Sequence, residues 1–130
     1  MPSLSTLHPA FRPHAESFFA WARQVFGGGL VVTSARRTWA DQERLYRRSL
    51  AGQNDGLPAS PPGSSDHELG LAMDLAFLNA RAIDDPRLRE LGSAWTRAGG
   101  KWWESDPVHF GAPRSWIDAA RGGRSRRRRV

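Results

Sequence analysis

The chain has 130 residues, of which 39% are hydrophobic, and it contains no cysteine. This length suits one domain with its own core, and the missing cysteine excludes disulfides and thiolate metal sites. Six of the 19 basic residues lie in residues 121–130, which leaves 13 basic against 13 acidic residues in 1–120. We therefore expect a single domain over 1–120 and a basic, disordered tail over 121–130. The net charge of +6 thus describes the tail and does not indicate a nucleic-acid-binding fold.

The N-terminal segment carries no targeting signal that we can identify. Residues 1–14 lack the apolar run of a signal peptide, and no stretch approaches the roughly 20 apolar residues of a membrane-spanning helix. From this we expect a protein that is made in the cytoplasm without a signal peptide and has no membrane span. We also expect a monomer.

Periodicity predicts the elements of the first half. Apolar residues recur at helical spacing over 11–26 and stop at three glycines, which indicates a helix that ends there. Residues 30–33 read as a short buried strand. Thr38 and Asp41 have the spacing of a capping box, which predicts a helix from there to about Leu50.

The second half alternates between loops and short regular elements. Residues 51–66 are rich in Gly, Pro and Ser and predict a long loop, which in a compact domain is often functional. Residues 70–77 alternate large and small apolar side chains, with Asp74 on the small face, as in a strand. Residues 86–98 predict a further helix that ends at two glycines.

The last elements complete an α+β domain. We expect residues 101–110 to be extended, with Pro107 marking an edge or a bend, and 113–120 to form a short helix. Few strands and several helices in this order predict a small antiparallel sheet with helices packed on one side of it.

Three residues have the chemistry and the placement of a metal site. His67 and Asp74 could not share an ion from one helix, where seven residues span about 10 Å along the axis. They can converge if the chain folds back between them, and Gly70 would permit that bend. His109 would add a third ligand from a neighbouring strand. Three protein ligands that leave a position for water are the pattern of a catalytic zinc site.

These segments resemble the VanY-type D-alanyl-D-alanine carboxypeptidases and the related L-alanyl-D-glutamate endopeptidases of phage and bacterial origin. The family motif Ser-x-His-x-x-Gly-x-Ala-x-Asp is matched at every fixed position, by Ser65, His67, Gly70, Ala72 and Asp74. The family's later motif, an acidic residue three before a histidine, is matched by Asp106 and His109. The resemblance covers roughly residues 30–112. It implies the hedgehog/D-Ala-D-Ala-peptidase-like fold, with a small antiparallel sheet carrying the helices.

The resemblance also implies roles for the site residues. One zinc ion per chain would be bound by His67, Asp74 and His109. Asp106 would be the general base that takes a proton from the attacking water. The carboxypeptidase branch has Glu at this position, so the Asp form is more similar to the endopeptidase branch. Glu104, five residues before His109, is the competing candidate for the base.

An upstream element, Ser34-Ala35-Arg36-Arg37-Thr38, is similar to the family's Ser-Gly-x-Arg-Ser segment. Arg37 aligns with the family arginine that holds the substrate carboxylate or the developing oxyanion, while Arg36 would take that role if the register were shifted by one. The other residues that we expect at the substrate are Ser65, Gln42, Tyr46 and Trp103. Ser65 has the alternative of an ordinary turn residue. We expect Asp66 and Glu68 to be solvated.

The sequence thus predicts a zinc-dependent hydrolase that cuts an amide bond in peptidoglycan stem peptides, as a phage lysis enzyme released to the cell wall. The Arg tail would bind anionic envelope polymers or serve only as solvated charge. One alternative is a zinc-containing wall-binding module without catalysis, although Asp106 argues against it. The other is a basic nucleic-acid-binding protein, which would need no zinc.

Overall fold

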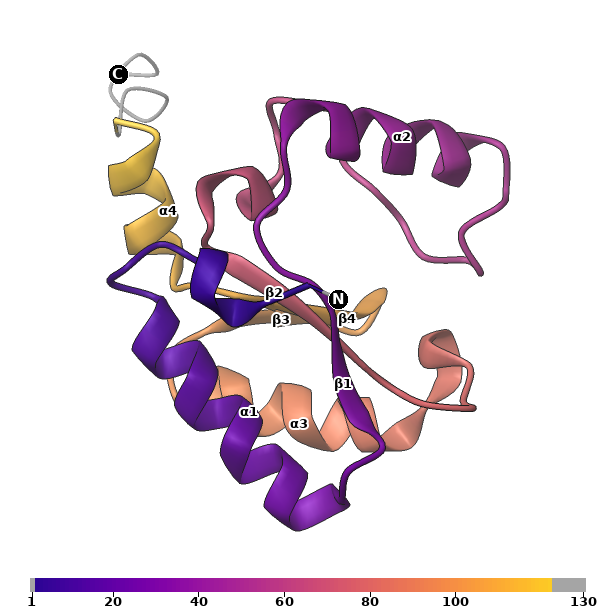
Figure 1. Cartoon of the computed structure of the whole chain (residues 1–130), viewed down its shortest axis with the longest axis vertical. Coiled ribbons are helices and arrows are strands. Elements are labelled where there is room, and N and C mark those ends of the chain that lie inside the picture. Colours follow the sequence, from indigo (N-terminus) through magenta and orange to yellow (C-terminus); the bar gives the residue numbers. More distant parts are fainter. Residues whose placement is uncertain (1, 123–130) are drawn as a thin grey trace.

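The computed structural model describes residues 2–122, and Figure 1 shows their arrangement. These residues form one four-stranded sheet with helices on both of its sides. The elements in chain order are η1 Leu4–Thr6, α1 Arg12–Phe26, β1 Leu30–Ser34, α2 Trp39–Leu50, η2 Asp66–Leu69, β2 Ala72–Phe77, η3 Ala82–Asp84, α3 Pro86–Arg97, β3 Lys101–Trp103, β4 Asp106–Gly111 and α4 Arg114–Ala120.

The sheet has the strand order β1-β2-β4-β3, and every neighbouring pair is antiparallel. The predicted α+β class is therefore confirmed. Figure 1 shows α1 and α3 along one side of the sheet, whereas α2 stands across the opposite side. Our expectation that the helices pack on one side was wrong for α2, which together with the loop after it covers the side that carries the site.

The last two strands differ from the prediction in a way that matters for the site. Residues 101–110 are not one extended segment but a hairpin, in which Trp103 pairs with Asp106 across a turn. Its second strand, β4, lies inside the sheet between β2 and β3. Pro107 is tolerated there because the residues of β4 that pair with β2 begin only at His109, so no ladder bond to β2 requires an N–H at Pro107.

The core lies between the sheet and the layer formed by α1 and α3. Trp95 of α3 is central to it, with its ring edge-on to Phe11 and Phe110 and its indole N–H donated to the Gly111 carbonyl at 2.8 Å. A methyl group on Gly100 would lie 2.1 Å from the Trp95 indole nitrogen, so only glycine allows this close approach. This packing fixes β4, and with it His109, against the helices.

The folded domain extends one residue further toward the C-terminus than the sequence predicted. Arg121, which we had assigned to the tail, follows α4 and contacts the carbonyls of Gly63 and Ser64, so it is part of the folded domain. The rest of the Arg-rich tail lies outside the described residues. None of the described helices is both long and apolar enough to cross a membrane.

Candidate metal centre and active site

Local backbone geometry places His67 in the site. Ser65 caps the short helix η2 by accepting a hydrogen bond from the His67 N–H, and Glu68 completes a capping box. Gly70 ends η2 in the left-handed conformation with φ of 72°, and this is the bend that the sequence required. The chain then enters β2, whose third residue is Asp74. Ser65 thus orients a ligand. Glu68 is not simply a solvated acid, because its carboxylate accepts a hydrogen bond from the Ser65 backbone N–H.

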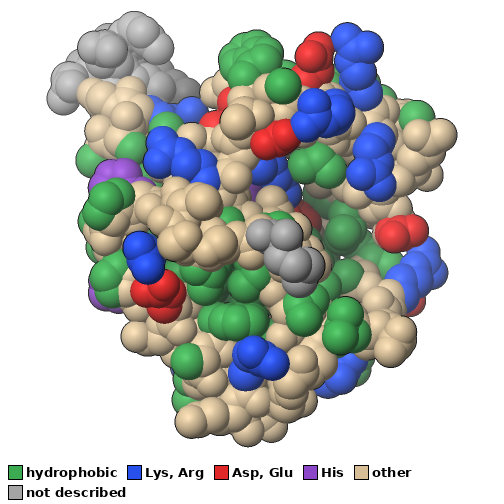
Figure 2. All heavy atoms as spheres, viewed as in Figure 1, with side chains coloured by type: hydrophobic (Ala, Val, Ile, Leu, Met, Phe, Trp, Pro, Cys, Tyr) green, Lys and Arg blue, Asp and Glu red, His purple; other side chains and the backbone are tan. Residues whose placement is uncertain are grey.

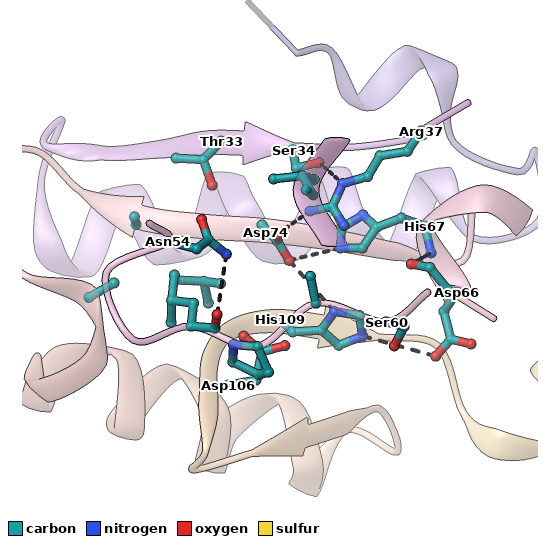
Figure 3. Close-up of a pocket in the computed structure, with 18 of the residues that line it drawn as sticks. Thr33, Ser34, Arg37, Asn54, Ser60, Asp66, His67, Asp74, Asp106 and His109 are labelled. Carbon is teal, nitrogen blue, oxygen red and sulfur yellow. Dashed lines mark hydrogen bonds and ion pairs between the residues drawn. The ribbon is translucent and has the colours of Figure 1, made fainter. Parts of the chain in front are cut away.

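Strand pairing brings the other two ligands together. Asp74 of β2 and His109 of β4 are directly opposite each other in the antiparallel ladder, where side chains on one face are neighbours. Asp74 Oδ1 lies 2.9 Å from His67 Nε2 and 3.6 Å from His109 Nδ1. Figure 3 shows the three side chains converging from η2, β2 and β4.

This group fits a single zinc ion. One ligand atom from each of His67, Asp74 and His109 lies within 4.8 Å of the others, and all three residues are buried. Tetrahedral zinc with bonds of about 2.0–2.2 Å places its ligand atoms about 3.4 Å apart, so the three side chains need only small shifts to bind the ion. The imidazole and carboxylate donors are those that a cysteine-free chain can offer.

The ligands interact strongly even without an ion. Burial would raise the pKa of Asp74, but the charge and hydrogen bonds of His67 and His109, together with the charge of Arg37, hold it well below its usual value. Burial would lower the pKa of His109, but the hydrogen bond and charge of Asp74 and the charges of two further carboxylates raise it. Asp74 is therefore ionised and ready to act as a ligand.

Arg37 is tied into the metal centre by three side-chain hydrogen bonds. Its guanidinium donates to Ser34 Oγ at 2.8 Å, to Gln42 Oε1 at 3.1 Å and to Asp74 Oδ2 at 2.7 Å. Arg37 lines the cleft, whereas Arg36 is exposed and does not line it. Gln42 is only 1% exposed, and it orients Arg37 and binds the Ser60 carbonyl rather than presenting itself to a substrate.

The two candidate bases differ sharply in environment. Asp106 lines the cleft beside His109, and burial followed by repulsion from Asp74 raises its pKa to about 6. Glu104 is 68% exposed at the hairpin turn, where it forms an ion pair with Arg89 at 2.7 Å, and it does not line the cleft. A carboxylate with a pKa near neutrality in a cleft is matched to proton transfer, which favours Asp106.

A cleft of about 690 Å³ opens over these residues. One wall comes from the loop after α2, including Asn54, Leu57 and Ser60, and the other from the β3–β4 hairpin. Trp103 lines the cleft with 44% of its surface exposed, so its ring is accessible to a molecule in the cleft. Tyr46 is not among the lining residues, whereas its neighbour Leu45 is, so the tyrosine lies outside the candidate site.

The sequence did not predict a cluster of charged side chains around Asp66, next to His109. Asp66, which we expected to be solvated, has a side chain only 14% exposed and forms ion pairs with Lys101 at 3.8 Å and Arg121 at 3.3 Å. Its position next to His67 was visible in the sequence, but its basic partners are 35 and 55 residues away and no local pattern points to them.

Comparison with known proteins identifies the family. A family model described as VanY, D-alanyl-D-alanine carboxypeptidase, matches residues 5–111. The chain belongs to this family. The match includes all three ligands, Arg37 and Asp106, which confirms the resemblance drawn from the motifs.

Individual relatives agree with this assignment. The chain is 31% identical over 77 residues to the peptidoglycan L-alanyl-D-glutamate endopeptidase CwlK of Bacillus subtilis. That alignment covers 59% of the chain and 46% of CwlK, so the chain spans less than half the length of this relative.

Solved structures show the same fold at lower identity. VanYB in complex with D-alanine-D-alanine has a TM-score of 0.64 at 18% identity, over 90% of this chain and 78% of that one. The vancomycin resistance D,D-pentapeptidase VanY E175A mutant in complex with Zn(II) has a TM-score of 0.63 at 19% identity, over 82% and 72%. The LD-carboxypeptidase LdcB has a TM-score of 0.62 at 17% identity, over 90% and 72%. The predicted peptidase fold is therefore confirmed.

Proposed function

We propose that this protein is a zinc-dependent peptidase that hydrolyses an amide bond in peptidoglycan stem peptides. The observation that carries the proposal is the buried group of His67, Asp74 and His109 at the floor of a cleft that Asp106 also lines. The family assignment supports this reading, since the relatives named above are peptidoglycan peptidases or bind D-alanine-D-alanine.

The residues of the cleft would divide the work as follows. His67, Asp74 and His109 hold the zinc ion, which supplies Lewis-acid polarisation and lowers the pKa of water. Asp106 takes the proton of the attacking water and passes it to the leaving amine. Arg37 holds Asp74 in its ionised, ligating orientation, so its first task in this structure is to position a ligand.

Two observations favour the L-alanyl-D-glutamate bond over the terminal D-alanyl-D-alanine bond. The relative that matches in sequence, at 31% identity over 77 residues, is the L-alanyl-D-glutamate endopeptidase CwlK. The proposed base is Asp106, the residue type that the motif comparison associates with the endopeptidase branch. The protein would accordingly cut within the stem peptide rather than trim its end.

A soluble stem pentapeptide that contains both bonds tests this assignment. Zinc-loaded protein is incubated with the peptide, and the products are identified by mass spectrometry. A free L-alanine carboxyl terminus is the expected product. Free D-alanine would instead show that the protein is a carboxypeptidase and that the endopeptidase assignment is wrong. If the protein binds one zinc per chain but releases neither product, it is the non-catalytic wall-binding module instead.

We also propose that the Arg-rich tail attracts anionic envelope polymers. Its charges would add to the binding of cell walls and would be screened by salt, with a Debye length of about 8 Å at physiological ionic strength. A chain that stops at Gly122 keeps Arg121 in the fold. It should cleave the soluble peptide at the full rate and bind walls less tightly at low salt. Equal binding by both chains would show that the tail is only solvated charge.

A role in phage lysis completes the proposal. The enzyme would be made in the cytoplasm and would reach the wall only when the membrane is opened. Expression in a bacterial cytoplasm should then leave the cells intact until the membrane is permeabilised, after which they should lyse. Lysis without permeabilisation would contradict this mode of delivery.

A further inference from the structure

His109 uses its two ring nitrogens differently. Nδ1 faces Asp74 on the ligand side, so Nε2 points away from the ligand group. Nε2 is buried and has no hydrogen-bond partner among residues 2–122. A histidine that binds a metal normally donates its remote N–H to a carboxylate or a carbonyl, which fixes the tautomer. His67 already has such an acceptor, because its Nδ1 lies 2.7 Å from the Ala35 carbonyl oxygen.

Asp66 supplies a carboxylate at the corresponding place for His109. Its Oδ2 atom lies 4.0 Å from His109 Nε2, and its side chain is 14% exposed. Figure 3 shows the His109 ring between Asp74 on one side and Asp66 on the other. Closing 4.0 Å to a hydrogen bond of about 2.9 Å requires a shift of only about 1 Å. Such a shift is small for the side chain of the first residue of η2.

Arg121 fixes Asp66 from the end of the last helix. Its guanidinium donates to Asp66 Oδ1 at 3.3 Å and to the carbonyls of Ser64 at 3.1 Å and Gly63 at 3.4 Å. The backbone N–H of Arg121 donates to the Ile117 carbonyl, so the residue caps the C-terminal end of α4. One arginine thus joins α4 to the segment that leads into His67.

We propose that Asp66 accepts the Nε2 proton of His109 in the zinc-loaded protein, and that Arg121 is the positioning residue that holds Asp66 in place. The inference rests on the proposed binding of zinc by His109. A proton fixed at Nε2 leaves Nδ1 unprotonated toward the ion, and the carboxylate makes the ring a stronger donor. The last helix of the domain would thereby set the affinity of the metal centre.

The test measures zinc affinity by competition with a chromophoric chelator. Asp66→Ala should weaken binding by about 10–100-fold, the range typical for the loss of such an outer carboxylate. Arg121→Ala should weaken it by a smaller factor, and adding Arg121→Ala to Asp66→Ala should have little further effect. The exposed Arg114, also on α4, provides the matched control, because Arg114→Ala removes an equal charge away from Asp66.

Two further measurements separate positioning from simple loop bracing. Nitrogen NMR should place the His109 proton at Nε2 in the zinc-loaded wild type and show it less well fixed in Asp66→Asn, which keeps the size of the side chain and serves if the alanine variant does not fold. The inference is wrong if the Asp66 variants that fold bind zinc as tightly as the wild type and only melt at a lower temperature. In that case Asp66 stabilises the loop and does not act on His109. A wild type that binds no zinc would instead overturn the proposed function.

Discussion

Replacing Asp106 by Asn should stabilise the zinc-free protein while it abolishes turnover. Burial and the nearby charge of Asp74 raise the pKa of Asp106 to about 6, although the charges of His109 and Arg37 act in the opposite direction. The charge of ionised Asp106 therefore costs more free energy in the folded, zinc-free state than in the unfolded chain. Asparagine has the same shape without the charge, so it removes this cost together with the proposed base.

The sign and the size follow from proton linkage. The folded state binds the Asp106 proton more tightly than the unfolded chain does. In the unfolded chain, the pKa of this carboxyl is near 3.8. The stabilisation by this proton is fully present below pH 3.8 and is lost as the pH rises through about 6. Each pKa unit corresponds to about 1.4 kcal/mol, so we expect a gain of roughly 1–3 kcal/mol for Asp106→Asn at pH 8. For a domain of this size, that is an increase in Tm of about 5–10 °C.

Thermal unfolding followed by circular dichroism, in chelator and from pH 4 to pH 8, measures the effect. The gain of Asp106→Asn over the wild type should be small at pH 4 and should grow through pH 6. Glu104→Gln is the control, since Glu104 is exposed and should show no such gain. Zinc should reduce the gain, because its charge favours the ionised carboxylate. An Asp106→Asn variant that melts at or below the wild-type temperature at pH 8 would refute the reasoning.

Three further predictions concern the ligands, the arginine and the core. Elemental analysis should find one zinc per chain in the wild type and in His14→Ala but none in His109→Ala, and full occupancy in His109→Ala would contradict the ligand assignment. Arg37→Ala should lower kcat/KM by about 10–100-fold, because Asp74 loses the guanidinium that holds it. Arg36 is exposed, so Arg36→Ala should keep nearly the wild-type rate, and the reverse order would contradict this role. Gly92→Ala should cost about 1–3 kcal/mol of unfolding free energy, because the added carbon would lie 2.2 Å from the Trp102 ring. Gly29→Ala is the control, since its added carbon meets no atom within 4 Å. Equal denaturation midpoints for the two variants would show that this packing argument is wrong.

Much of the fold could be predicted from the sequence, because the patterns that indicate its helices and strands involve residues close together in the chain. The helical periodicity over 11–26, the Thr38 capping box and the alternation around Asp74 each depend on residues a few positions apart, and the structure has α1, α2 and β2 at those places. The ligand group was predictable for a related reason, since the spacing from His67 to Asp74 across Gly70 is itself a local feature.

Features that depend on distant partners were not predictable. The sequence could not tell that β4 is an inner strand, because that depends on its pairing with β2, more than 30 residues away. The sequence could not show that the Arg37 guanidinium also donates to Asp74, 37 residues later. Asp66 looked solvated because its partner Arg121 is 55 residues away in the sequence.

Digestion of purified sacculi tests the central claim most directly. Zinc-loaded wild-type protein and Asp106→Asn are incubated with the sacculi, and the soluble and insoluble fragments are identified by mass spectrometry. We predict that the wild type creates new termini by cutting the stem peptides, that a chelator stops the reaction, and that Asp106→Asn keeps its zinc but loses about 10²–10⁴-fold in rate. Sacculi with unchanged stem peptides after incubation with a wild-type protein that carries one zinc per chain would contradict the account.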